Sequence, residues 1–79
     1  MKADKYIAGS QIAKARGKLK PPLTQLELSR QLKRLGANMD RAAIAKVENG
    51  LRGIQDYELI PLAKALKVSV NWLLTGKGR

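Results

Sequence analysis

The 79-residue chain contains no cysteine, no histidine and no phenylalanine, and its only aromatic residues are one tryptophan and two tyrosines. Without cysteine there is no disulfide framework and no thiolate nucleophile, and without cysteine or histidine a zinc site lacks its usual ligands. Zinc fingers and cysteine-dependent enzymes are therefore excluded. Apolar runs stay far below the roughly 20 residues that a membrane-spanning helix requires. We expect a cytoplasmic protein without a membrane partner.

Acidic residues are also scarce, since six Asp and Glu stand against 16 Lys and Arg and give a formal net charge of +10. Hydrophobic residues make up 44% of the chain, which is enough for a folded core. At this length folding buries only about 60% of the surface of the extended chain, so a single domain spanning residues 1–79 needs a compact core. A folded polycation most often binds a polyanion.

The first half of the chain carries the signals of two helices. One is predicted from Asp4 to Lys18, because apolar residues recur there at spacings of four, three and four. These residues are Ala8, Ile12, Ala15 and Leu19. Thr24 followed by Glu27 is a capping box, which predicts a second helix from Gln25 to Leu35 that ends at Gly36. Its apolar side consists of Leu28, Leu32 and Leu35.

A third predicted helix has two distinct faces. Asp40 is a suitable N-cap, so the helix begins at Arg41, and Gly50 ends it after Asn49. At about 100° per residue, one half is apolar apart from its glutamate: Ala43, Ile44, Val47 and Glu48. The other half holds Arg41, Ala42, Ala45, Lys46 and Asn49. Such a face fits the major groove of DNA, where arginine pairs with guanine and alanine methyls contact thymine. Taken alone, it also fits an ordinary solvated surface.

Two further helices complete the prediction. The fourth begins near Asp56, and Pro61 inside it predicts a kink or a ragged first turn. Its apolar residues are Leu59, Leu62, Ala63 and Leu66. Ser69 caps a short final helix that ends at Gly76. No segment alternates apolar and polar residues as a strand would, so we predict an all-α architecture.

Two capped helices joined by a turn with Gly36 form a helix-turn-helix arrangement, whose second helix enters the groove. Three stretches of the sequence also resemble the lambda-repressor and Cro-like (XRE) helix-turn-helix domains. These are residues 23–29 (LTQLELS), 44–50 (IAKVENG) and 66–74 (LKVSVNWLL). The resemblance covers roughly Ile7 to Gly76 and leaves a short basic tail at 76–79. It implies a compact five-helix bundle that binds operator DNA as a transcriptional regulator, usually a repressor.

The same resemblance assigns roles to residues that match the family pattern. The base-facing positions are Arg41, Ala42, Ala45 and Lys46. The phosphate-contacting positions are Gln25, Asn49 and Arg52, and the family also places this glutamine against recognition-helix side chains. One departure affects these assignments, because the chain has about five residues more than the common family spacing between Leu32 and Ile44. The second helix is then expected to be longer by a turn.

Arg16 and Glu48 each lie at the edge of an apolar helical face, where an isolated charge is costly. We therefore expect them to pair with each other. In the resembled family an arginine of the first helix pairs with the glutamate before Asn-Gly and fixes the recognition helix on the bundle. This pair is interpreted as structural, because Glu48 has no second carboxylate near it in sequence to support catalysis.

Binding to double-stranded DNA is the function that the sequence favours, with a homodimer on an inverted repeat as the expected complex. The candidate dimer contacts are Val70, Trp72, Leu73 and Leu74. We expect no enzyme activity, cofactor, metal or small-molecule ligand. Nucleotide binding in particular is unsupported, since Gly50 to Gly53 lacks the pattern of a phosphate-binding loop. The alternative is an antitoxin-like protein, whose helix-turn-helix domain regulates its own gene while another surface neutralises a toxin.

Overall fold

The computed structural model describes residues 7–77, and within them the chain forms five α-helices and no strand. The helices are α1 (Ile7–Lys18), α2 (Gln25–Arg34), α3 (Arg41–Glu48), α4 (Asp56–Leu66) and α5 (Val70–Thr75). The all-α prediction and the five predicted helices are confirmed. The predicted start of the first helix at Asp4, and Arg79 of the basic tail, lie outside the described residues.

Helix starts follow the predicted caps. The Glu27 amide donates to Thr24 Oγ1 at 3.1 Å, and the Thr24 amide donates to Glu27 Oε1 at 2.9 Å, so the capping box is confirmed. This contact from the Thr24 amide lowers the pKa of Glu27. Asp40 and Ser69 cap α3 and α5 by accepting from the third amide of each helix. These bonds satisfy amides that have no partner inside a helix.

The first helix ends at Lys18 as predicted, whereas α2 and α3 each end one residue earlier than predicted. Leu35 was placed inside the second helix and on its apolar side, but it follows the last residue of α2 and is 42% exposed. The reason is that the chain turns at Gly36, whose φ of +92° is left-handed, before Ala37 returns to the core. Asn49 likewise follows α3 as its C-cap. For α4 the prediction was a kink or a ragged first turn. The first turn is ordered, because Glu58 Oε1 accepts from the Gln55 amide at 2.8 Å. The kink at Pro61 stays a prediction.

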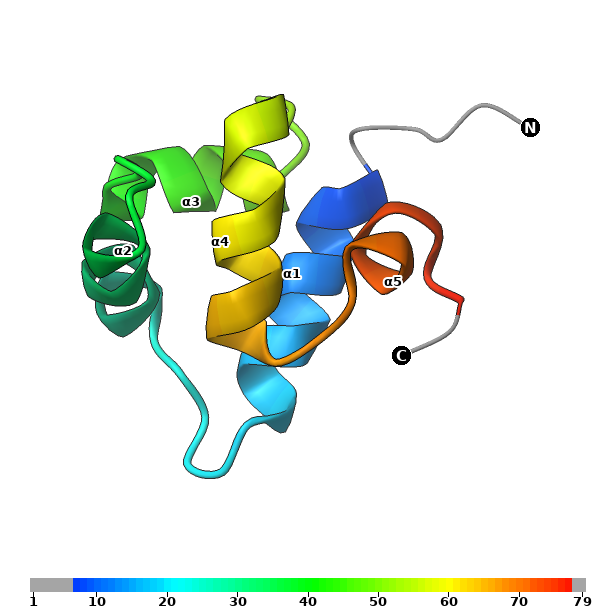
Figure 1. The fold of residues 1–79 in the computed structure, drawn as a ribbon, viewed down its shortest axis with the longest axis horizontal. Coiled ribbons are helices and arrows are strands. Elements are labelled where there is room, and N and C mark those ends of the chain that lie inside the picture. The colour runs from blue at the N-terminus through cyan, green and yellow to red at the C-terminus, as the bar shows by residue number, and fades with distance from the viewer. Residues whose placement is uncertain (1–6, 78–79) are drawn as a thin grey trace.

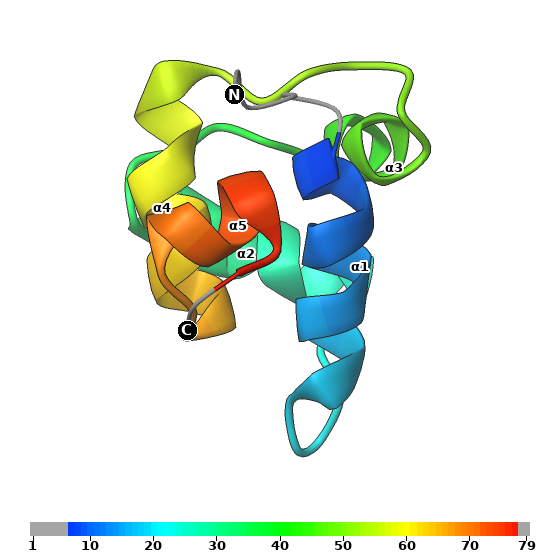
Figure 2. The same cartoon turned by 90° about the vertical axis from the view of Figure 1, so that its right-hand side faces the viewer.

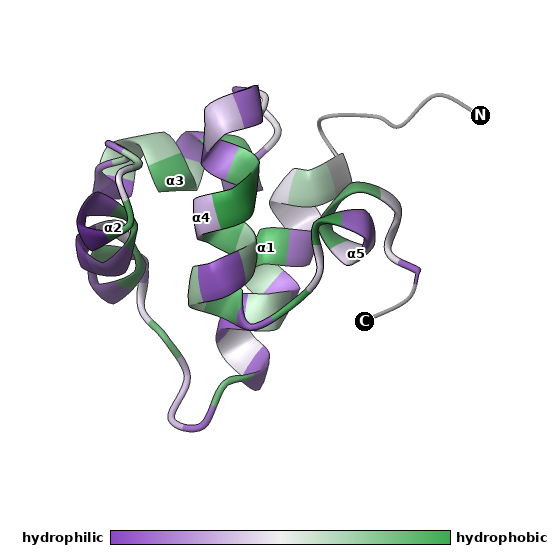
Figure 3. Cartoon of the chain, in the orientation of Figure 1, coloured by the Kyte–Doolittle hydropathy of each residue, from purple (hydrophilic) through white to green (hydrophobic). Residues whose placement is uncertain are grey.

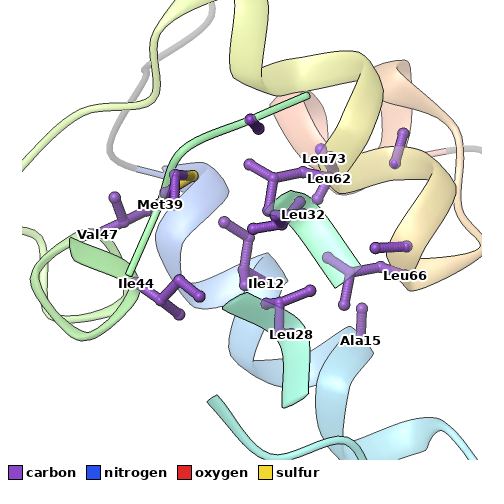
Figure 4. Packing of buried hydrophobic residues seen from close by; sticks show 13 residues of the cluster. Ile12, Ala15, Leu28, Leu32, Met39, Ile44, Val47, Leu62, Leu66 and Leu73 are labelled. Carbon is purple, nitrogen blue, oxygen red and sulfur yellow. The ribbon is translucent and has the colours of Figure 1, made fainter. Parts of the chain in front are cut away.

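One hydrophobic core joins the helices (Figures 1 and 4). α1 packs against α3, α4 and α5, and α2 packs against α3 and α4. The largest buried apolar side chains converge from all five helices: Ile12, Leu28, Leu32, Ile44, Leu62, Leu66 and Leu73. The outer side of α2, by contrast, is hydrophilic (Figure 3). No helix in residues 7–77 is long and apolar enough to span a bilayer.

The connection between α2 and α3, residues 35–40, is mostly exposed but reaches the core through two of its residues. Ala37 is fully buried and Met39 is 2% exposed, so both belong to the core. The Ala37 amide donates to Leu32 O at 2.8 Å, which ties the turn to the end of α2. Two residues of this connection, Ala37 and Met39, are therefore held by core contacts.

Gly9 lets α1 approach the end of α3 closely. A Cβ built on Gly9 would overlap the carbonyl group of Val47 in α3, which is backbone and cannot rotate away. A Cβ on Gly17, in the same helix, would have no neighbouring atom within 4 Å. Only the first of these glycines is therefore required by packing.

These two positions form a matched pair of substitutions. Gly9→Ala should lower the free energy of unfolding by about 1–3 kcal/mol, because the added methyl forces the backbones of α1 and α3 apart. Gly17→Ala should raise it by about 0.5–1 kcal/mol, because alanine is the better helix former. Urea unfolding of the two variants measures both changes. Equal, small effects would contradict the close approach of α1 to α3.

Candidate nucleic-acid interface

Helix α3 lies at the upper end of the molecule in Figures 1 and 2, with half of its surface on the core. Ile44 and Val47 point inward and are each 1% exposed. The residues of the other half are exposed, except for Ala45, which is half-buried: Arg41, Ala42, Lys46 and Asn49. The two faces predicted for this helix are confirmed. Its outer face combines two cations with two small side chains that allow a flat partner to approach.

The N-terminal ends of α2 and α3 border a common hollow of about 330 Å³. Arg41 lines it from α3, and Thr24, Gln25 and Leu26 line it from the start of α2. Arg16 of α1 also reaches this hollow. The structure thus brings Arg41, a predicted base-contacting residue, beside Gln25, a predicted phosphate-contacting residue.

Glu48 fixes the C-terminal end of α3 through bonds to two other helices. Arg16 Nε donates to Glu48 Oε2 at 2.9 Å, and Arg16 Nη2 donates to Oε1 at 3.0 Å. Gln25 Nε2 donates to the same Oε1 at 3.0 Å. The predicted Arg16–Glu48 pair is confirmed, and so is the contact of Gln25 with the recognition helix. The hydrogen bonds to Glu48 raise the pKa of Arg16 above its usual range.

Arg16 also holds the segment that leads into α2. Its Nη1 donates to Leu23 O at 2.9 Å, and the Leu23 amide donates back to Arg16 O at 3.1 Å. One guanidinium group therefore positions both the start of α2 and the end of α3. Charge-assisted and bidentate hydrogen bonds are the strong ones in proteins, so this arrangement ties the start of α2 and the end of α3 to α1.

The side chain of Arg52, which follows α3, forms hydrogen bonds to other residues of the protein. Its guanidinium donates to Glu58 of α4 at 3.1 and 2.8 Å, and to Gly53 O at 3.2 Å. Glu58 is fully buried, whereas the side chain of Arg52 is 29% exposed. Burial alone would raise the pKa of Glu58, but the hydrogen bonds from Arg52 and from the Gln55 amide lower it below its usual value. The carboxylate therefore stays charged inside the fold.

The three residues predicted to contact phosphate differ in their exposure and in their hydrogen bonds. Asn49 is exposed at the end of α3, while the side-chain amide of Gln25 is half-buried and bound to Glu48. Arg52 uses both terminal nitrogens for Glu58 and Gly53, and its Nε takes no part in these bonds. Of the three, only Asn49 presents a side chain without a protein partner among residues 7–77.

The four candidate dimer contacts do not form one surface. Leu73 is fully buried in the core, so it was wrongly assigned to a dimer contact. Val70 and Leu74 are half-buried and lie about 40° apart around α5, since a helix turns by roughly 100° per residue. Trp72 lies on the other side of Leu73 and borders a groove with Lys67. The remaining candidate surface consists of Val70 and Leu74.

Sequence reasoning missed three contacts that shape this site. Glu58 was not singled out, because Gln55, three residues before it, is not one of the Ser, Thr, Asp or Asn residues that mark a helix start. The packing role of Gly9 left no local signal, because it depends on the neighbouring Val47 carbonyl. The partner of Arg52 was missed because the resemblance offered a different role for that residue.

Comparison with known families agrees with this geometry. A family model described as helix-turn-helix matches residues 22–73, which include α2, α3 and α4. No curated protein matches the chain. The match covers 52 of the 79 residues, counted from 22 through 73. The chain therefore belongs to the lambda repressor-like (XRE) helix-turn-helix family of DNA-binding transcription regulators.

Proposed function

We propose that the chain is a sequence-specific repressor that binds double-stranded operator DNA through the outer face of α3. The observation that supports this most directly is the exposed row of Arg41, Ala42 and Lys46 on a helix whose other face is in the core. Arginine and lysine can reach the guanine edge in the major groove, and alanine permits close approach to thymine methyls. Ala45 completes this base-facing set.

Phosphate contacts would fix the register of the domain on the duplex. We assign them to Asn49 and Gln25, and to Arg52 through its Nε group, which is not used for Glu58. Such contacts position a protein without reading sequence. Repression needs only occupancy of the operator, without a cofactor, whereas activation needs a further surface for the transcription machinery. For this reason we favour repression.

A homodimer on an inverted repeat is part of the proposal. Helix α3 has only eight residues, so one copy contacts too few base pairs for useful specificity. Two copies related by a two-fold axis read half-sites about one helical turn apart. Val70 and Leu74 of α5 are the apolar side chains that we assign to the contact between copies.

Selection of bound sequences from random duplex DNA tests the proposal directly. We expect a conserved inverted repeat among the selected sites. Affinity for them should fall steeply with salt, with a slope near −0.9 for each of about four to six phosphates contacted per protomer. Binding that does not change between low and physiological salt would exclude the DNA interface. Selected sites without symmetry, bound by a single copy in ultracentrifugation, would exclude the homodimer.

Substitutions of Arg41 and Lys77 distinguish base recognition from general electrostatic attraction to DNA. Arg41→Ala should lose about 1–3 kcal/mol of discrimination at one base position and keep most nonspecific binding. Lys77→Ala removes the same charge from the exposed segment after α5 and should weaken all sequences slightly and equally. Competition binding with operators altered one base pair at a time measures both variants. A uniform loss for Arg41→Ala would assign Arg41 to the phosphate backbone.

The antitoxin-like alternative shares this DNA interface and adds a second surface for a protein partner. It is favoured by a groove at the C-terminal ends of α1 and α4. These helix ends lie away from α3 (Figures 1 and 2). Variants of Arg41 would then lose discrimination between operator sequences and leave neutralisation of a toxin intact. Co-expression of the Arg41→Ala variant with the product of a neighbouring toxin gene distinguishes the two candidates.

A further inference from the structure

A groove of about 230 Å³ lies where the end of α1 meets the connection between α4 and α5. We call it the α1–α5 groove and define it by Lys18, Leu19, Lys67, Val68 and Trp72. α3 and the DNA-binding face lie at the opposite end of the molecule (Figures 1 and 2). A ligand in this groove would leave the recognition helix free, so this inference does not rest on DNA binding.

Polar and apolar atoms contribute similar shares of the surface of the α1–α5 groove. Leu19, Val68 and Trp72 are half-buried, so each offers part of its surface to a partner. Lys18 and Lys67 are exposed, and neither forms an ion pair with a carboxylate within residues 7–77. Apolar surface beside two unpaired ammonium groups fits an apolar group that is flanked by negative charge.

Lys67 is the unusual residue of this groove. Its φ of 60° and ψ of 42° place it in the left-handed region, where a side chain is unfavourable and glycine is preferred. The chain uses glycine at the other left-handed helix ends, namely Gly36, Gly50 and Gly76. Strained backbone positions concentrate at functional sites. The presence of a lysine at this turn, where its side chain lines the groove, supports a binding role for its ammonium group.

The size and charge of the groove limit what can fill it. Small-molecule sites usually enclose about 300–1,000 Å³, so this smaller groove is better suited to one side chain of a larger partner. A second copy of this chain is a poor occupant, because its net charge is +10. Four of its carboxylates are also already bound within the fold: Glu27, Asp40, Glu48 and Glu58.

We propose that the α1–α5 groove docks an acidic segment of another protein. One large apolar side chain of that segment packs between Leu19, Val68 and Trp72, and neighbouring carboxylates pair with Lys18 and Lys67. Buried apolar surface supplies the affinity, and the two lysines select for negative charge.

Selection from a displayed library of random peptides tests this docking site. Enriched peptides should combine a large apolar residue with neighbouring Asp or Glu. A synthetic copy that contains no tryptophan should shift the fluorescence of Trp72, which is the only tryptophan of the chain. The shift should persist when the selected DNA is bound, because the two faces are separate.

Two substitutions separate docking from general attraction. Lys67→Gly removes the ammonium and retains a residue suited to the left-handed turn, so the fold is kept and peptide affinity should fall by about two- to fivefold. Lys33→Ala removes the same charge from α2, outside the groove, and should leave affinity unchanged. Equal losses for both variants, or full binding after the apolar residue of the peptide is replaced by Ser, would overturn the proposal. The proposal would also be overturned if the peptides selected from the library did not combine an apolar residue with Asp or Glu.

Discussion

Arg52→Ala is expected to lower the free energy of unfolding by about 3–5 kcal/mol, because it leaves the fully buried carboxylate of Glu58 without its charged partner. The same substitution removes the donor to Gly53 O, which lies in the segment between α3 and α4. Chemical unfolding at neutral pH measures the loss. The control is Glu58→Leu together with Arg52→Met, which replaces the pair by apolar groups and should be far less destabilised.

The pH dependence gives this prediction a second readout. The folded pKa of Glu58 lies below its unfolded value. Its contribution to stability is therefore present above the unfolded pKa and is lost as pH falls through the folded pKa. In Arg52→Ala, burial without the arginine raises the pKa of Glu58 instead, so acid protonates the carboxylate in the folded state. The difference in free energy of unfolding between the two proteins should therefore begin to narrow above the usual glutamate pKa of about 4.3 and continue to narrow below it. A gap that is constant with pH would show that Glu58 is not the stranded group.

If Arg52→Ala is as stable as the unaltered protein, the only role left for Arg52 is a contact with the phosphate backbone of DNA. The bidentate contact with Glu58 argues against that outcome, since both terminal nitrogens of the guanidinium are already used there and at Gly53. We therefore attribute the main effect of Arg52 to holding the segment that follows α3 against α4. A phosphate contact through Nε would add to this role.

Local signals in the sequence were sufficient for the helices. Thr24, Asp40 and Ser69 cap the helices that they were predicted to cap, because a cap depends on residues three positions apart. Leu35 was misplaced for a related reason. A leucine at helical spacing looks like part of the apolar side, but the left-handed turn at Gly36 ends the helix before its side chain reaches the core.

Contacts between distant segments were predictable only where charge made isolation costly. Arg16 and Glu48 could be paired from the sequence because each stood beside an apolar face. The burial of Leu73 could not be predicted in this way. This residue lies between Trp72 and Leu74 in a short apolar run, and only the packing of α5 on α1 and α4 shows which member of that run is buried.

Arg16→Ala is expected to lower the free energy of unfolding by about 3–5 kcal/mol, because the side chain of Glu48 is only 7% exposed and would keep Gln25 as its one remaining partner. Leu23 O would lose its donor as well. Glu48→Gln should cost less, about 1–3 kcal/mol, because Arg16 is 21% exposed and retains Leu23. Gln25→Ala, which removes one neutral donor, should cost about 1 kcal/mol. Thermal and urea unfolding of the three variants measures these losses and ranks them.

The same three variants test whether this junction positions α3 for DNA. At a temperature where Arg16→Ala is still folded, its affinity for the selected operator should fall while its salt-dependent affinity for unrelated duplex DNA remains, because the exposed cations of α3 are unchanged. Gln25→Ala should show a smaller loss of the same kind. Stability and specificity would then change together across the series, as expected when one guanidinium holds the start of α2 and the end of α3. If Arg16→Ala unfolds readily but discriminates between operators as well as the unaltered protein, core packing at Ile44 and Val47 alone is enough to orient the recognition helix.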